Sequence, residues 1–309
     1  MSTPYPRIIV TGMGSSNFAG LPLWRRLVKA GWPAWWVSAT ELLDSPDLVT
    51  GESLLLAISQ SGRSGEVVAL LDGGILRPRT VIGVTEDQAS PLAEAADITV
   101  ALRSGAEATV SSKSYLNTLA AHRRILAALG QAVPSAVECD IAAAADDLAD
   151  RHGNSVPAQL AHRAAEGPDT RVALVGKADD AATALLGGLI FKEAARVAAE
   201  GYVGGAFRHG PLELAGPGLT AVLLGGMDGD LDASLVALAG ELVAARSQVL
   251  VVGGRSVPGC LHEPAEHASS LRHLVLATAV VQQISVELAR AKGLVPGAFR
   301  FGQKVTSTL

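Results

Sequence analysis

Residues 53–66 have the residue types and spacing of an anion-binding segment. An apolar run, residues 54–58, has the length of a buried parallel strand. The polar segment Ser59-Gln60-Ser61-Gly62-Arg63-Ser64 follows, and apolar residues then recur at helical spacing from Val67. Hydroxyl and backbone N–H groups at the start of a helix attract anions, because the helix dipole favours negative charge there. These residues predict a phosphate loop, and a serine-rich loop with a helix cap is the alternative explanation.

Two further segments place hydroxyl groups between an expected strand and an expected helix. Residues 7–10 precede Gly12-Met13-Gly14-Ser15-Ser16, which lacks the third glycine of a dinucleotide-binding fingerprint. Ser111-Ser112-Lys113 precedes an apolar helix that ends near Leu129. Taken singly, each segment also fits a tight turn or a capped helix. In a doubly wound sheet all three loops would meet beyond the carboxyl ends of the strands, which favours one shared phosphate site.

Glu193 and His209 are of the residue types that transfer protons. Glu193 lies on a mostly apolar segment that we predict to be a helix over residues 182–200, and His209 lies in a glycine-rich loop, residues 201–210. Glu193 also has a structural explanation as the ion-pair partner of Arg196, and His209 has one as a hydrogen-bonding group of its loop. Taken alone, these positions favour the structural explanations.

Composition indicates a globular protein that handles small molecules. The chain has 309 residues, which exceeds one ordinary domain, and its 49% hydrophobic and 18% charged residues permit large cores. The net charge of −5 gives no reason to expect nucleic acid as a partner. An anionic ligand would have to be held by local donors rather than by the overall field.

Cysteine use and the chain start predict a cytoplasmic protein without a metal or a cofactor. Cys139 and Cys260 fit neither a disulfide framework nor a metal cluster, which favours a reducing compartment. The first ten residues lack a charged-then-apolar signal, and we expect no apolar run long enough to cross a membrane.

The order of expected elements predicts an α/β fold with a doubly wound parallel sheet. Helical segments separate the expected strands, and an alanine-rich helical connector follows over residues 134–167. The expected strands of the first half are residues 7–10, 33–37, 54–58, 80–85 and 98–102.

The second half repeats the pattern of the first. Residues 171–176 repeat the pattern of residues 7–12 and also precede a helix, so we expect two domains, residues 1–150 and 151–309. Where the first half has Gly14-Ser15-Ser16, the second has Ala178-Asp179-Asp180, whose carboxylates would repel a phosphate. Only the first domain is therefore expected to hold the phosphate.

Taken together, the motifs resemble the sugar isomerase (SIS) domain family, and specifically the tandem-SIS isomerase half of the glucosamine-6-phosphate synthases. The similarity covers essentially the whole chain. The matching segments are Gly14-Ser15-Ser16, Ser59-Gln60-Ser61-Gly62-x-Ser64, Ser111-Ser112-Lys113, Lys192-Glu193, Glu200-x-Tyr202, His209-Gly210-Pro211 and residues 300–306.

The resemblance implies a fold, an activity and an assembly. It implies two tandem SIS domains, each a three-layer αβα sandwich with a flavodoxin-like sheet. The implied activity is phosphosugar isomerisation of a ketose/aldose or amino-sugar 6-phosphate, similar to fructose 6-phosphate or glucosamine 6-phosphate. Amination or deamination with ammonia belongs to the same range of reactions. The implied partners are a sugar phosphate and a second copy of the chain, in a homodimer with a shared active site.

The resemblance also implies roles for individual residues. Glu193 would be the general base that moves a proton between C1 and C2, and His209, from the partner subunit, would assist ring opening. Lys304 would contact the open-chain carbonyl and would form a Schiff base with it when the amine is neutral. The phosphate and the sugar hydroxyls would be bound by Ser15, Ser16, Ser59, Gln60, Ser61, Ser64, Ser111 and Ser112.

The departures from the family pattern limit these implications. Ile190 stands where the synthases have a second lysine, and Leu186 stands where they have a further glutamate. Ser2 stands where a glutaminase domain would need an N-terminal cysteine, so we expect no glutamine-dependent ammonia delivery by this chain. Two other functions stay open, a fructosamine-6-phosphate deglycase and a non-catalytic phosphosugar-binding regulator. The joint presence of Glu193, His209 and Lys304 favours an enzyme.

Overall fold

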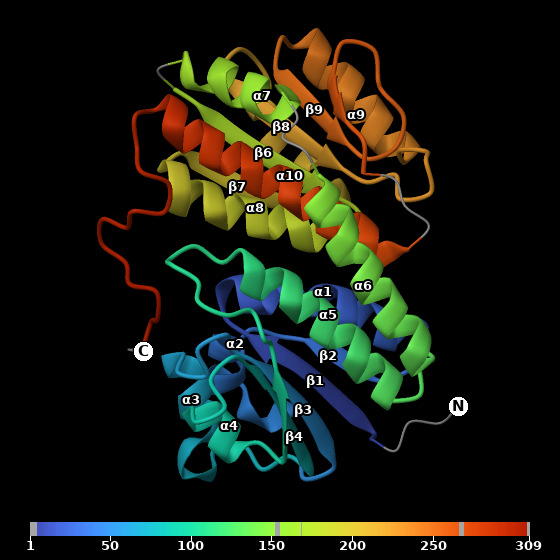
Figure 1. Cartoon of the computed structure of the whole chain (residues 1–309), viewed down its shortest axis with the longest axis vertical. Helices are drawn as coiled ribbons and strands as arrows, with labels where there is room; N and C mark the ends of the chain where they lie inside the picture. The colour runs from blue at the N-terminus through green and yellow to red at the C-terminus, as the bar shows by residue number, and fades with distance from the viewer. Residues whose placement is uncertain (1–4, 152–154, 168, 266–268, 308–309) are drawn as a thin grey trace. The chain divides into compact units, whose positions relative to one another are not determined.

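The computed structural model describes residues 5–151, 155–167, 169–265 and 269–307 of the chain (Figure 1). The chain divides into two compact units: Met1–Val137 together with Phe301–Leu309, and Glu138–Arg300. The C-terminal tail therefore belongs to the first unit, although it follows the second unit in the sequence. Ser2 lies outside the described residues.

The first unit is built on one parallel sheet. Its strands are β1 (Arg7–Gly12), β2 (Ala34–Trp36), β3 (Ser53–Ile58), β4 (Thr80–Thr85) and β5 (Ile98–Ala101). They are ordered β2-β1-β3-β4-β5, which confirms the predicted strands and the doubly wound sheet. The strand order reverses between β1 and β3, and open α/β sheets bind ligands at the carboxyl ends of the strands beside such a reversal.

Helices cover both faces of this sheet (Figure 1). Leu54 and Leu56 of β3 pack on the face that carries α1 and α5, and Leu55 and Ala57 pack on the other face. Strands buried on both faces need apolar side chains throughout, which is why residues 54–58 form a continuous apolar run. The helices are α1 (Gly14–Lys29) and α5 (Lys113–Ala128) on one face, and α2 (Ala39–Asp44), α3 (Gly65–Leu71) and α4 (Pro91–Ala95) on the other.

The second unit has a parallel sheet of the same kind. Its strands are β6 (Arg171–Gly176), β7 (Ala198–Val203), β8 (Leu219–Leu224), β9 (Gln248–Val252) and β10 (Leu261–Glu263), ordered β10-β9-β8-β6-β7. Read from the β7 edge, this is the strand order of the first unit, so the predicted internal repeat extends to the topology. Helix α6 (Pro134–Asp150) begins in the first unit, which ends at Val137, and continues in the second. The other helices of the second unit are α7 (Ser155–Ala165), α8 (Asp180–Ala195), α9 (Ala233–Ala244) and α10 (Ser270–Ala291).

The predicted helix over residues 182–200 is wrong at its C-terminal end. Helix α8 ends at Ala195, Arg196 takes a left-handed conformation (φ 53°), and the chain continues as strand β7. A close backbone approach explains the strand, because a Cβ on Gly201 would lie 2.3 Å from the Ala184 carbonyl oxygen of α8. The packing of Gly201 against α8, rather than the helical propensity of residues 196–200, determines where the helix ends.

Helix α10 corrects the expectation that no segment is long and apolar enough to cross a membrane. An 18-residue window of α10 has a mean hydropathy of 1.3, and 56% of that window is buried inside the protein. The helix packs against α7 and α8. Its apolar character is accounted for by this packing, as in the core helix of a globular protein.

His122 of α5 couples the stability of the first unit to pH. The residue is only 2% exposed, and this burial lowers the pKa of its imidazole from 6.5 to about 4. Between these two values the unfolded chain binds a proton at His122 that the folded chain does not bind. The contribution of His122 therefore makes the folded state less stable as the pH falls from 6.5 to 4.

We expect His122→Leu to remove this pH dependence, because leucine fills the site without titrating. The unfolding free energy of the wild type, relative to that of the variant, should fall by about 3 kcal/mol between pH 7 and pH 4. Urea unfolding of both proteins across this range measures it. A difference that stays constant with pH contradicts the prediction.

Candidate active site

The segments after β1, after β3 and before α5 lie at the reversal of strand order in the first sheet. Gly12 and Ile58 are paired at the ends of β1 and β3. Ser15, in the first turn of α1, donates a hydrogen bond of 2.7 Å to the hydroxyl of Ser111, just before α5. The first and third of the predicted segments are therefore in direct contact. Ser16, next to Ser15, donates its backbone N–H to the Met13 carbonyl.

The segment after β3 forms a compact turn of hydroxyl groups. Ser59 is buried, and its hydroxyl lies 2.9 Å from that of Ser64, the residue that precedes α3. The Ser61 hydroxyl accepts a hydrogen bond of 3.1 Å from the backbone N–H of Arg63. The Gln60 carbonyl accepts a hydrogen bond of 3.0 Å from the backbone N–H of Glu86, which fixes this turn to the end of β4.

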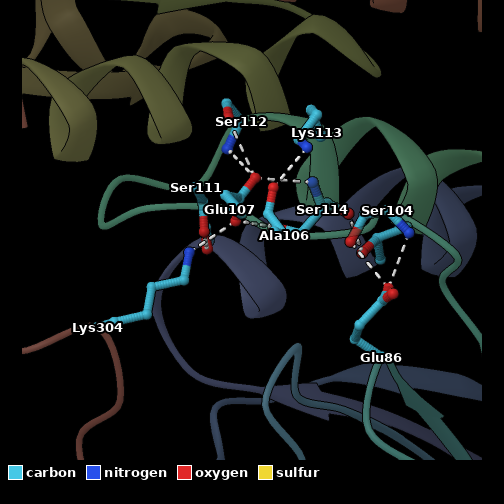
Figure 2. A network of polar contacts seen from close by, with 11 residues as sticks. Glu86, Ser104, Ala106, Glu107, Ser111, Ser112, Lys113, Ser114 and Lys304 are labelled. Carbon is cyan, nitrogen blue, oxygen red and sulfur yellow. Dashed lines mark hydrogen bonds and ion pairs between the residues drawn. The ribbon is translucent and has the colours of Figure 1, made fainter.

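The segment before α5 is organised around the carboxylate of Glu107 (Figure 2). Its oxygens accept the backbone N–H groups of Ser112 and Ser114, both at 2.9 Å, and the hydroxyls of the same two serines at 3.1 and 2.7 Å. The fifth donor is the Lys304 ammonium, at 2.6 Å. Glu107 thus accepts hydrogen bonds from N–H groups at the start of α5. These groups have no carbonyl acceptor within the helix itself.

The electrostatics of Glu107 follow from these contacts. Burial by itself would raise the pKa of Glu107, since its side chain is 2% exposed. The bonds from Lys304, Ser114 and Ser112 outweigh burial and lower the pKa from 4.5 to about 2. The carboxylate is therefore fully ionised at neutral pH.

Residues of the C-terminal tail are hydrogen-bonded to Glu107 and to the start of α3. Lys304 reaches Glu107 beside α5, and the carbonyl of Thr306 accepts a hydrogen bond of 3.0 Å from the backbone N–H of Gly65, the first residue of α3. The tail thus connects the starts of two helices that follow serine segments. Lys304, 23% exposed, lies in the same unit as all the predicted phosphate-binding residues.

The other two predicted catalytic residues lie in the second unit. Glu193 is half-buried on the last turn of α8, next to Lys192, whose ammonium pairs with Glu200 of β7 at 2.9 Å. His209 is exposed and follows a short 3₁₀ helix, Gly204–Arg208. Phe207 anchors that helix, since it is fully buried and packs edge-on against Tyr202, with ring centroids 5.1 Å apart.

The second unit fills the corresponding strand ends with paired charges. After β6, Lys177 pairs with Asp232 at the start of α9 at 2.7 Å. Asp180, in the first turn of α8, lies 2.8 Å from Nε2 of the buried His273. These carboxylates already have cationic or hydrogen-bonding partners. Across the part of the chain that the structure describes, no group of three or more His, Cys, Asp or Glu side chains is arranged to hold a metal ion.

The sequence reasoning missed Glu107 and Glu86. Glu86 accepts hydrogen bonds from Ser104 N–H and hydroxyl, both at 2.8 Å, and so braces the segment that carries Glu107. Neither residue stands at a position that a capping rule marks, because Glu107 precedes Ser112, the N-cap of α5, by several residues. Only the folded path of residues 103–114 brings these carboxylates to their donors.

Comparison with known proteins identifies the class that this sheet and its loops define. The family model described as SIS domain matches residues 3–128, so this part of the chain belongs to the SIS domain family. The chain is 31% identical over 228 residues to the glutamine–fructose-6-phosphate aminotransferase (isomerizing) of Symbiobacterium thermophilum. That match covers 71% of the chain but 37% of the relative.

Solved structures share the fold over nearly the whole chain. The C-terminal domain of glucosamine-fructose-6-phosphate aminotransferase from Francisella tularensis has a TM-score of 0.79 at 19% identity, covering 95% of this chain and 87% of that one. Glucosamine-6-phosphate deaminase from Thermotoga maritima has a TM-score of 0.75 at 20% identity, covering 97% and 90%. The similarity in fold therefore includes the second unit.

We expect Gly62→Ala to disrupt the turn after β3. Gly62 has φ +65°, and a Cβ there would lie 1.9 Å from the hydroxyl oxygen of Ser90. Left-handed strain and the clash together should lower the unfolding free energy by about 2 kcal/mol or more. Gly51→Ala is the matched control, because a Cβ at Gly51 would meet nothing within 4 Å. Equal urea-unfolding free energies for the two variants contradict this prediction.

Proposed function

We propose that the chain is a phosphosugar isomerase that acts on a ketose/aldose or amino-sugar 6-phosphate. The observation that carries the proposal is the meeting of hydroxyl-rich turns with the C-terminal lysine in one SIS unit. Ser15 contacts Ser111, Ser59 contacts Ser64, and Lys304 is bonded beside Ser112 and Ser114 through Glu107. Hydroxyls suit a phosphate and sugar hydroxyls, and a lysine suits a carbonyl.

We extend the SIS assignment to the second unit, so that the chain consists of two tandem SIS domains, which correspond to the two compact units, with the C-terminal tail belonging to the first. The shared strand order of the two sheets supports this. In this proposal the first domain binds the phosphosugar through Ser15, Ser16, Ser59, Gln60, Ser61, Ser64, Ser111 and Ser112.

The proposed chemistry is a proton transfer along an open-chain sugar. His209 assists opening of the ring, and Glu193 removes a proton from one carbon and returns it to the neighbouring carbon. Lys304 interacts with the carbonyl that moves between C1 and C2. Glu193 and Lys304 belong to different units, and His209 is supplied by a second copy of the chain in a cytoplasmic homodimer.

The names of the similar proteins indicate the range of reactions to consider. They are called an isomerizing aminotransferase and a deaminase, both of 6-phosphate sugars. In this chain the two positions at which the synthases carry a further lysine and glutamate are Ile190 and Leu186, and both side chains are fully buried in the second unit. The proposed base, imidazole and carbonyl lysine (Glu193, His209 and Lys304) are all present, so we place isomerisation first, ahead of ammonia-dependent amination or deamination and of fructosamine-6-phosphate deglycation.

A non-catalytic phosphosugar-binding regulator is the second candidate. The ion pair between Lys304 and Glu107 favours it, since an ammonium group held by a carboxylate forms no Schiff base with a carbonyl until it loses a proton. A turnover assay on whichever hexose or hexosamine 6-phosphate raises the melting temperature distinguishes the two functions.

The first test concerns binding. Ser61→Ala combined with Ser64→Ala removes two hydroxyls from the turn after β3. Each lost bond to a charged group costs roughly 1.5–3 kcal/mol, so the Kd for the sugar phosphate should rise about 100-fold or more. Ser135→Ala, an exposed serine of the same unit, is the control. Unchanged affinity of the double variant in calorimetry means that the phosphate binds elsewhere.

The second test concerns the shared site. We expect Glu193→Gln and His209→Ala to lose most turnover, on the order of 100-fold each. If His209 acts across a two-fold interface, a mixed dimer has one intact site and one doubly defective site. Full random exchange of the two variants should then restore roughly a quarter of the wild-type rate. Light scattering must show a dimer, and no recovery despite exchange contradicts action from the partner subunit.

A further inference from the structure

The Glu107 carboxylate binds both the start of α5 and the C-terminal tail of the chain. It receives two backbone N–H groups and two hydroxyls from the start of α5, and the ammonium of Lys304 from the C-terminal tail (Figure 2). The side chain is 2% exposed, so these contacts are made largely away from water. Charge-assisted hydrogen bonds in such surroundings are stronger and more directional than exposed ones.

The described part of the C-terminal tail contains no strand or helix that could hold Lys304 in place. Among the described residues from 292 onward the structure has no helix or strand, and Phe301, just before the lysine, is 93% exposed. Lysine itself is a flexible side chain with several rotatable bonds. The direction of its amine therefore depends on what it bonds to, and that group is Glu107.

We propose that Glu107 is a positioning residue for Lys304: it fixes the lysine amine beside the serine segments and keeps the tail docked against α5. The effect of this positioning on catalysis rests on the proposed function, whereas the docking of the tail does not. Glu107 acts through Lys304 and need not touch the sugar phosphate. The same carboxylate orders residues 112–114, so one side chain sets the geometry of the third serine segment and of the lysine together.

The chain contains a matched control for Glu107. Glu86 is a second carboxylate that braces the same loop, by accepting Ser104 N–H and hydroxyl at 2.8 Å and Gly105 N–H at 3.2 Å. Glu86→Gln therefore loosens the loop without removing the partner of Lys304. A merely structural role of Glu107 would give both variants the same effects.

The first readout needs no activity. Lys304 is labelled with an amine-reactive acetylating reagent, and the modified peptides are quantified by mass spectrometry, with the exposed Lys29 as internal reference. We expect Glu107→Gln to accelerate the labelling of Lys304 about 10-fold or more relative to Lys29, because the amine loses its charged partner. Glu86→Gln should leave the ratio within about twofold of the wild type. An unchanged ratio in Glu107→Gln overturns the proposal.

The second readout uses turnover of the sugar phosphate. Glu107→Gln should lower kcat about 10-fold or more, and Glu107→Asp should recover part of that loss. In a Lys304→Met background Glu107→Gln should have little further effect on kcat, since the residue that it positions is gone. Additive losses overturn the positioning role.

The two readouts separate failure of this proposal from failure of the proposed function. A wild type that turns over no sugar phosphate contradicts the enzyme but leaves the labelling result to decide on Glu107. If Glu107→Gln does not fold, Glu107→Asp carries the labelling test, because the shorter side chain weakens its contact with Lys304. Labelling of Lys304 should then be several-fold faster than in the wild type, and an unchanged rate overturns the proposal.

Discussion

The close contact of β1 with β3 is the constraint on which the candidate site depends. Gly12 pairs with Ile58 at the ends of these strands, and a Cβ on Gly12 would lie 2.8 Å from the Ile58 carbonyl oxygen. Only glycine permits this approach without displacing the backbone. Because the two strands end side by side, the hydroxyl-bearing turns after them, with Ser15 and Ser59, begin at the same edge of the sheet.

The two units use the same strand order for different local chemistry. In the first, the strand ends carry hydroxyls that form hydrogen bonds with other hydroxyls, as in the contacts Ser15–Ser111 and Ser59–Ser64. In the second, the corresponding ends carry carboxylates held by Lys177 and His273. Neutral hydroxyls have the capacity to donate to an anion, whereas ionised carboxylates only accept hydrogen bonds. The topology is therefore shared and the ligand chemistry is not.

Glu107 shows how a buried carboxylate is stabilised by hydrogen-bond donors from several segments of the chain. An isolated carboxylate with a 2% exposed side chain would be strongly disfavoured. Here the start of a helix supplies unsatisfied N–H groups, two serines supply hydroxyls, and the tail supplies a cation. These hydrogen bonds outweigh the effect of burial, so the ionised form of Glu107 is favoured and its pKa falls to about 2. The same hydrogen bonds hold together the start of α5 and the C-terminal tail, which are remote in the sequence.

The sequence by itself determined the strands, most helices, the internal repeat and the serine segments, because these depend on local periodicity and on residue type. The hydroxyls of Ser61 and Ser111 were recognisable from their position between an apolar run and a helical pattern. Tertiary structure alone decided that α8 ends at Ala195, since the contact of Gly201 in β7 with α8 overrides the helical propensity of an alanine-rich stretch. It also decided the partner of Lys304, because Glu107 lies 197 residues earlier in the chain and no local sequence rule connects the two.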